Sequence, residues 1–218
     1  MHWGLDVEHL KLVSKHLLMG RPRTITNEQI LEAAETLFLA HGPTVPTSEI
    51  AQKLNISEAT IFKRFPTKEA LLKEALQFEP IDLDEFLDSR VGVEPVPIVL
   101  NTLIRKLVRF YKVMIPRAMM LRQIHAFDPM KEFMDNPESP PLRGLHAISR
   151  YLASERDAHR IRLRDPEPVA RMVMGAAMNL ASFSWMQIPG HDRLDDAQYA
   201  EEVVQILLDG ISLQGGSS

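Results

Sequence analysis

The stretch TSEIAQKLNISEATIFKRF, residues 47–65, decides the fold. Apolar residues recur in it every three or four positions on both sides of Asn55, and this period predicts two short helices joined by a turn. Ala51 is small enough for the second helix to cross the first, and Asn55 tolerates the left-handed backbone that the turn requires. Ile56 and Ile61 supply apolar contacts after the turn and midway along the second helix. These spacings predict a helix-turn-helix, which places its second helix in the major groove of DNA. A plain pair of antiparallel helices is the alternative interpretation.

The rest of the chain also shows a helical period. No sustained alternation of apolar and polar residues indicates a sheet, so the sequence predicts an all-α fold. Residues with short polar side chains stand where helices should begin and are expected to cap them: Thr26, Thr47, Ser57, Thr67 and Asp165. Pro116 is expected to kink or divide its helix. The predicted helices span 27–41, 48–54, 58–64, 68–78, a short part of 81–97, 97–126, 141–158, 166–187 and 196–213, with a loop over 128–141.

Two consecutive segments resemble a known family. QILEAAETLFLAHG and the following TSEIAQKLNISEATIFKRFPTKEALL are similar to the N-terminal DNA-binding domain of the TetR family of bacterial transcriptional regulators. The similarity covers about residues 24–78, and its elements occur in the same order and at the same distances. It implies an N-terminal arm (1–23), a helix-turn-helix DNA-binding domain (24–78), a larger helical ligand-binding and dimerisation domain (79–214) and a flexible tail (215–218).

The chain departs from the family pattern at four places. Asn55 and Ala59 each stand where Gly is common, and the loop from Gly42 to Ile50 is one residue shorter than usual. Phe62 stands where a Tyr commonly contacts a DNA phosphate through its hydroxyl. The resemblance therefore implies a DNA contact at Phe62 that packs without donating a hydrogen bond.

The charges near the helix-turn-helix matter by their placement. The formal net charge is −4, so the field of the whole chain does not attract nucleic acid and a contact must be local. Residues 47–74 contain five basic and four acidic side chains. Lys63 lies on the second helix, and Lys68 lies in the first turn of the next, where its charge opposes the helix dipole. This position indicates an anionic partner such as a DNA phosphate, with a solvated lysine as the alternative.

Besides Phe62, nine residues are expected to contact the bases or the backbone of DNA. Thr60 can bond a base edge or touch a thymine methyl group, and Lys63 can donate to guanine. The base contacts are expected from Ser57, Glu58, Ala59, Thr60 and Lys63, and the phosphate contacts from Thr47, Lys68, Arg21 and Arg23. The two arginines flank Pro22 before the first helix and can act as an arm that reaches phosphates or the minor groove.

The last two predicted helices expose more apolar surface than one protomer can cover. The helix over 166–187 is apolar on most of its surface, and small residues such as Gly175 permit close helix approach. The resemblance implies a homodimer with a four-helix interface from 166–187 and 196–213, which sets two recognition helices about one DNA turn apart on a palindromic operator in double-stranded DNA. Plain core helices are the alternative interpretation.

A ligand pocket is expected between the helices over 97–126 and 141–158. Methionine side chains adapt to varied apolar shapes, although such a stripe at helical spacing is also typical of a core. The candidate lining residues are Phe110, Met114, Met119, Met120, Ile124 and Phe127, with Arg122 and His125 as polar contacts.

Several classes of protein are excluded or disfavoured. The chain has no Cys, so disulfides and thiolate metal sites are excluded, and no segment is long and apolar enough to predict a membrane span. No zinc-type His and Glu spacing, phosphate-binding glycine loop or nucleophile signature is present, so we expect no catalytic residue, metal or cofactor. Residues 1–18 form either an amphipathic helix or a leader that precedes a natural start at Met19.

Taken together, the residues and the resemblance predict a cytoplasmic, ligand-responsive transcriptional regulator. A repressor that a small apolar or amphipathic effector releases from its operator fits this reading. The alternatives are an all-α enzyme that contains this hairpin and a helical interaction protein that binds no DNA.

Overall fold

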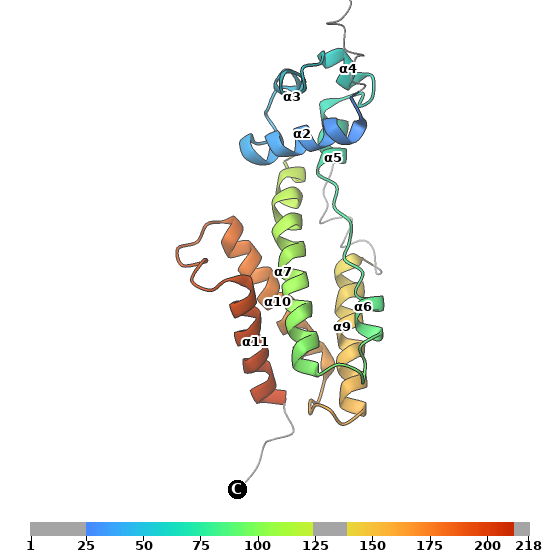
Figure 1. Ribbon diagram of the computed structural model, residues 1–218, viewed down its shortest axis with the longest axis vertical. Helices are drawn as coiled ribbons and strands as arrows, with labels where there is room; N and C mark the ends of the chain where they lie inside the picture. The colour runs from blue at the N-terminus through green and yellow to red at the C-terminus, as the bar shows by residue number, and fades with distance from the viewer. Residues whose placement is uncertain (1–24, 124–138, 212–218) are drawn as a thin grey trace, which may run out of the picture.

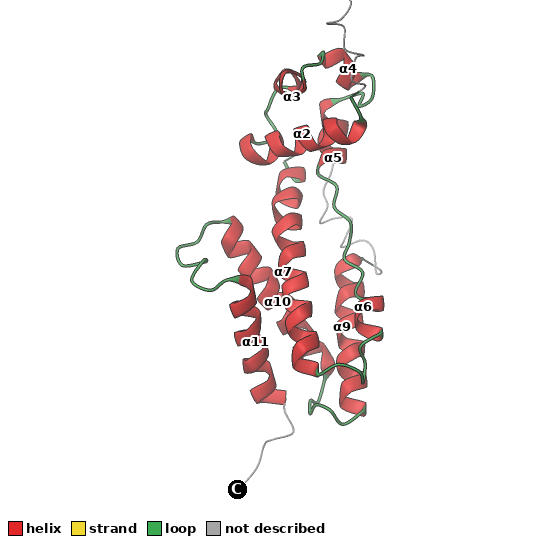
Figure 2. Ribbon diagram, in the orientation of Figure 1, coloured by secondary structure: helices red, strands yellow, loops and turns green. Residues whose placement is uncertain are grey.

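The computed structural model describes residues 25–123 and 139–211, and every regular element within these ranges is an α-helix (Figure 2). The predicted all-α fold is therefore confirmed for the described part of the chain. Four helices form an N-terminal domain that sits on one end of the long helix α7 (Figure 1). These helices are α2 (Asn27–His41), α3 (Thr47–Leu54), α4 (Glu58–Phe62) and α5 (Lys68–Ala75).

The predicted N-terminal caps are confirmed at four helices. The Thr26 hydroxyl accepts from Gln29 N at 3.3 Å while Gln29 Oε1 accepts from Thr26 N at 3.0 Å, which completes a capping box. Ser57 accepts from the amide of Thr60, Thr67 accepts from that of Ala70, and Asp165 accepts from that of Glu167. Each cap satisfies an amide that the first helical turn leaves without a partner.

The predicted cap at Thr47 is wrong. Thr47 is the first residue of α3 rather than its cap, and Pro46 takes the cap position with φ −65° and ψ 143°. Proline already holds the extended backbone that a cap residue needs, so the helix begins one residue earlier than predicted. The Thr47 side chain makes no capping bond and is only 6% exposed.

Two helix ends in the N-terminal domain also differ from the prediction. Helix α4 ends at Phe62 instead of 64. After Phe62 the backbone makes a 3-10-type hydrogen bond, in which Arg64 N donates to Ile61 O, three residues earlier, at 2.9 Å. Pro66 follows directly and disfavours helical geometry at the residue before it. Helix α5 ends at Ala75 instead of 78, so that Phe78 belongs to the connection between the domains.

The remaining helices form the C-terminal domain. They are α6 (Asp84–Asp88), α7 (Val96–Leu121), α9 (Pro140–Asp157), α10 (Pro166–Trp185) and α11 (Asp196–Ile211). Helix α7 is central: α10 and α11 pack along it, and its far end reaches α2 (Figure 1). Pro116 lies inside α7 and does not divide it, contrary to one of the two expected outcomes.

Each domain has its own apolar core. Ile30, Phe38, Ile50, Ile61 and Phe65 are among the buried residues of the N-terminal core, which also takes in Leu121 from the end of α7. The second core gathers residues of α7, α9, α10 and α11. The two cores therefore meet through one helix.

Some expectations fall outside the described residues. They concern the arm with Arg21 and Arg23, the candidate pocket residues Ile124, His125 and Phe127, most of the loop over 128–141, and the tail.

Candidate functional site

The turn between α3 and α4 has the geometry that the sequence predicts. Asn55 has φ 55° and ψ 46°, which is left-handed backbone. Ile56 N donates to Ala51 O at 3.0 Å, so the turn satisfies one of the carbonyl acceptors in the last turn of α3. Ala51 and Ile61 are both buried in the N-terminal core. This packing fixes the angle at which α4 crosses α3.

Helix α4 presents one face outward at the end of the N-terminal domain away from α7 (Figure 1). Ser57, Glu58 and Ala59, at its start, are exposed, while Thr60 is half-buried. The hydroxyls of Ser57 and Thr60 share a hydrogen bond of 2.9 Å. The Thr60 hydroxyl is thus held in place before any partner arrives. Its oxygen has two lone pairs and one proton, which leaves capacity for a further bond.

The end of α4 carries an apolar and a cationic side chain. Phe62 is exposed although it is apolar, and Lys63, at the C-terminal cap, is exposed too. Within the described residues Lys63 forms no ion pair, so its ammonium is available to a ligand. Lys68 is half-buried in the first turn of α5.

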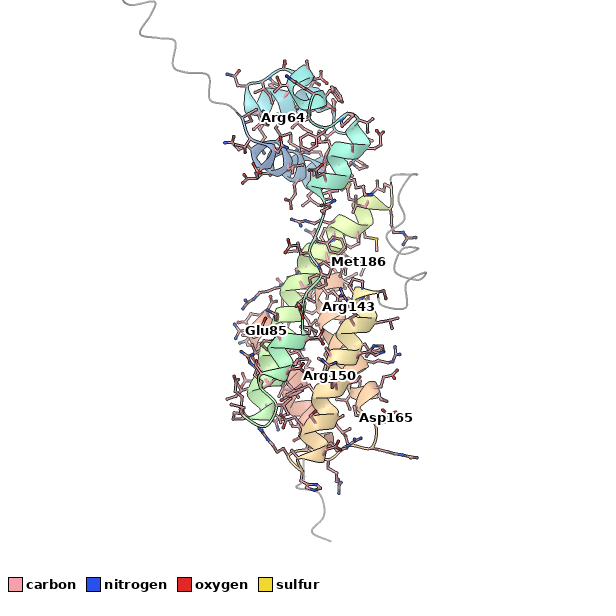
Figure 3. The ribbon with its side chains drawn as sticks, turned by 90° about the vertical axis from the view of Figure 1, so that its right-hand side faces the viewer. Arg64, Glu85, Arg143, Arg150, Asp165 and Met186 are labelled. Carbon is pink, nitrogen blue, oxygen red and sulfur yellow. The ribbon has the colours of Figure 1, made fainter. Side chains whose placement is uncertain are left out.

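Arg64 behaves differently from its neighbour Lys63. Its Nη1 donates to Oδ1 of Asn27, the first residue of α2, at 3.2 Å (the position of Arg64 is labelled in Figure 3). The pKa of Glu28 is lowered, first by its own backbone amide, then by the Thr26 side chain, with a smaller contribution from Arg64. Arg64 therefore holds α4 against α2, and the two adjacent cations have separate roles.

An apolar cavity lies in the C-terminal domain. Its volume is about 70 Å³, and its walls come from the connection after α5 and from α7, α9 and α10. The lining residues are Phe78, Pro80, Ile81, Leu83, Leu107, Phe110, Tyr111, Met114, Pro140, Pro141, Gly144, Met174 and Met178. No charged side chain lines it among the described residues, so the cavity suits an uncharged apolar molecule.

The candidate pocket residues separate into two groups. Phe110 and Met114 line the cavity. Met120 instead packs against the N-terminal core, and Met119 and Arg122 are exposed near the end of α7. Sequence reasoning missed Phe78, Met174 and Met178, which come from segments far apart in the chain. The FEPIDL region around Pro80 carried no signal beyond its proline.

The comparisons with known proteins agree with this geometry. Residues 30–75 match the family described as "Bacterial regulatory proteins, tetR family", and the match covers α2 to α5. The helix-turn-helix domain is therefore a TetR-family domain. Over 68 residues it is 38% identical to YvkB, an uncharacterized HTH-type transcriptional regulator of Bacillus subtilis. That alignment spans 31% of this chain and 36% of the length of YvkB.

Solved structures share the fold over most of the chain. NalD, the secondary repressor of the MexAB-OprM multidrug efflux pump in Pseudomonas aeruginosa, is 17% identical with a TM-score of 0.58, covering 87% of this chain and 98% of NalD. The SmeT–triclosan complex is 17% identical with a TM-score of 0.57, covering 87% of this chain and 92% of SmeT. SmeT is the repressor of the multidrug efflux pump SmeDEF of Stenotrophomonas maltophilia.

Within the described residues, the C-terminal domain leaves apolar side chains of α10 and α11 exposed. Met172 is 56% exposed and Ile206 is 66% exposed, and Phe183 and Met186 of α10 and its C-terminal cap are exposed as well (Met186 is labelled in Figure 3). Met172, Phe183 and Met186 share one side of the helix by their spacing. A Cβ placed on Gly175 would meet nothing within 4 Å, so a second helix could approach there closely.

The described residues contain neither a membrane-spanning helix nor a cluster of metal-ligating side chains. No helix in them is long and apolar enough to cross a bilayer. Nor do His, Asp and Glu side chains gather in threes or more as a metal site would need, within the same residues.

Proposed function

We propose that the protein is a DNA-binding transcriptional repressor that acts as a homodimer and is released by a small uncharged apolar molecule. The observation that carries the proposal is helix α4, which is anchored by the buried Ile61 and carries the exposed Glu58, Ala59 and Lys63. A short helix held this way fits the major groove with its outward residues at base edges.

The contacts follow from the chemistry of the exposed side chains. Lys63 would donate to guanine, and the Glu58 carboxylate can accept from the exocyclic amine of cytosine. Phe62, which has no hydroxyl, would contact thymine methyl groups or sugar. The DNA phosphates would be neutralised by Lys68, Arg21 and Arg23. Thr47 is buried, so its part in phosphate binding would be through the first amides of α3.

Dimerisation would place two α4 helices on the same DNA duplex. The exposed apolar face of α10 and α11 supports a symmetric interface, in which the same face of each protomer packs against the other. A two-fold pair of α4 helices would read a palindromic site in double-stranded DNA. A repressor of this kind would work in the cytoplasm.

The apolar cavity supports an effector of matching chemistry. At about 70 Å³ it is smaller than the ~150 Å³ engineered cavity that binds benzene, so a ligand would have to displace flexible lining side chains. Met114, Met174 and Met178 are unbranched and adapt readily to such a change. That SmeT has been solved with triclosan, and that SmeT and NalD are repressors, supports this assignment by analogy of fold.

Selection of DNA by the purified full-length protein tests the proposal. A random duplex pool should yield a palindromic sequence that shifts in a gel at moderate salt. Lys63→Ala should weaken binding to it by about 1–3 kcal/mol. Lys106→Ala, which removes an exposed lysine of α7 far from α4, is the matched control and should bind as the wild type does. Recovery of no sequence, with weak binding to every duplex, would exclude the function. Persistence of the complex in saturating triclosan and a panel of similar neutral aromatics would exclude the effector.

A further inference from the structure

One side chain of α7, that of Arg117, contacts both α2 and the segment that follows α5. The Arg117 Nη2 atom pairs with Oε1 of Glu35 in α2, and its Nη1 donates to the backbone oxygen of Gln77 at 2.8 Å. The side chains of Arg117 and Glu35 are only 19% and 28% exposed, so water and salt screen the pair less than they screen a surface ion pair. The planar guanidinium can meet both acceptors at once, which a lysine ammonium on a flexible stem does poorly.

The segments that Arg117 joins are also walls of the apolar cavity. Phe78 follows Gln77 directly and lines the cavity, and Met114 lines it one helical turn before Arg117. The rings of Phe78 and Phe110 meet edge to face with centroids 6.3 Å apart. A molecule that enlarges the cavity must push on Phe78, on Met114 or on both.

Movement of the Phe78 backbone changes the Arg117 contacts. The Gln77 carbonyl belongs to the peptide that leads into Phe78, so a backbone shift at Phe78 turns or withdraws this acceptor. Gln77 directly follows Leu76, the C-terminal cap of α5. Leu76 is buried in the N-terminal core. A displaced Gln77 therefore also pulls on α5, which packs against α2.

The end of α7 makes the link stiff. Leu121 is buried in the N-terminal core and Met120 packs against the same core. The N-terminal domain is thus fixed at the tip of α7 by apolar contacts and at its side by Arg117. Loss of the side contact leaves the tip as a pivot.

We propose that Arg117 couples the apolar cavity to the DNA-binding domain by clamping Glu35 and Gln77 in the DNA-binding arrangement. This inference rests on the proposed function. A ligand in the cavity displaces Phe78, withdraws the Gln77 carbonyl and weakens the clamp, and α2 to α5 then turn about the tip of α7. The two states differ in identified contacts, as an allosteric coupling requires.

A substitution can stand in for the unidentified ligand. Gly144 lies on α9 in the cavity wall, and a Cβ there would sit 3.7 Å from Leu83 Cδ1, an ordinary contact. Gly144→Leu therefore fills the cavity without a backbone clash. If Gly144→Leu does not fold, Met178→Trp fills the same cavity from a residue that is partly exposed.

A double-mutant cycle in the full-length protein tests the coupling. Affinity for the selected duplex is measured for the wild type, Gly144→Leu, Arg117→Gln and the double variant. Each single change should weaken binding by about tenfold, within the range of known couplings, and the double variant should bind no more weakly than either single one. Effects that multiply, or a Gly144→Leu protein that binds as the wild type does, would overturn the proposal.

A second ion pair on the same helix provides the matched control. Lys112 Nζ lies 2.6 Å from Asp196 Oδ1 and joins α7 to α11 within the C-terminal domain. Lys112→Gln also removes one ion pair of α7, but its effect should multiply with that of Gly144→Leu. A cycle with Lys112 as strongly non-additive as that with Arg117 would mean that general loosening of α7, and not the clamp, carries the signal.

A measurement without DNA separates this inference from the proposed function. Amide hydrogen exchange should rise in α5 (Lys68–Ala75) when the cavity is filled, and should rise no further when Arg117→Gln is added. If the protein selects no DNA and the exchange still shows this pattern, the proposed function fails and the coupling stands. If the protein binds its operator but α5 shows no exchange response when the cavity is filled, the proposed function stands and the coupling fails.

Discussion

Arg64, two residues after helix α4, donates to Asn27, the first residue of α2, at 3.2 Å. The sequence places Arg64 beside Lys63 in what reads as one basic patch. The structure divides it: Arg64 braces the helix-turn-helix against α2, whereas Lys63 faces outward. Two adjacent cations of this small domain therefore differ in what their removal should change.

Arg64→Ala and Asn27→Ala should each lower the free energy of unfolding by about 0.5–1 kcal/mol, because the bond is partly exposed. The double variant should lose no more than the larger single loss, since both changes remove one bond. Urea unfolding of the four proteins measures this cycle. Lys63→Ala is the control and should leave the unfolding free energy unchanged while weakening DNA binding. A stability loss at Lys63 equal to that at Arg64 would contradict the division.

The turn residue Asn55 should be replaceable by glycine but not by alanine. At φ 55° a Cβ crowds its own backbone, and Asn tolerates this conformation better than Ala does, so Asn55→Ala should lose about 1 kcal/mol of stability. Asn55→Gly relieves this contact but makes the unfolded chain more flexible, so its stability should stay close to the wild-type value. Chemical denaturation of both variants, with Gln52→Ala in the preceding helix as control, measures the difference. Equal stability of the Ala and Gly variants would show that the left-handed backbone does not determine which residues position 55 tolerates.

Local chemistry explains which parts of the fold the sequence predicts. The caps at Thr26, Ser57 and Thr67 depend on residues three positions apart, and these were predicted correctly. Thr47 was mistaken for a cap because Pro46, with its fixed φ, can hold the same position without a side-chain bond. The prediction extended α4 to residue 64 although Pro66 disfavours helical geometry just before it, and no residue of the local pattern marks the end of α5 at Ala75.

The cavity could be predicted only in part, for a reason of distance along the chain. Phe110 and Met114 lie one turn apart on α7, so their shared face is visible in the sequence. Phe78 and Met174 reach the same cavity from other segments, and no spacing relates them to α7. The pairing of Arg117 with Glu35 likewise joins residues 82 positions apart.

The uncovered face of α10 and α11 should be the dimer interface. Met172→Glu or Ile206→Glu would place a charge in an apolar contact and should weaken the dimer by on the order of 2 kcal/mol, about thirtyfold, or more. Sedimentation equilibrium measures the change, and affinity for the palindromic duplex should fall with it. Val93→Glu, which changes an exposed apolar residue in the turn between α6 and α7, is the control and should leave a dimer. A protein that stays dimeric with both Met172→Glu and Ile206→Glu must dimerise through another surface.

Tyr111, a buried residue in the cavity wall, should make the protein less stable in alkali. Burial raises the pKa of its hydroxyl from 10.0 to about 12, because the phenolate is poorly solvated there. Between these values the unfolded chain loses the proton and the folded chain keeps it, so this group's contribution is intact below pH 10 and is lost as the pH rises toward 12. The loss at pH 11 is about 1.4 kcal/mol.

Tyr111→Phe removes the ionisation but keeps the ring, so its unfolding free energy should fall less than that of the wild type between pH 9 and pH 11. Tyr151 and Tyr199, whose pKa values burial also raises, remain in both proteins, so the difference between the two urea-unfolding series reports Tyr111 alone. Parallel losses in the two series would mean that the Tyr111 hydroxyl ionises in the folded protein as readily as in water.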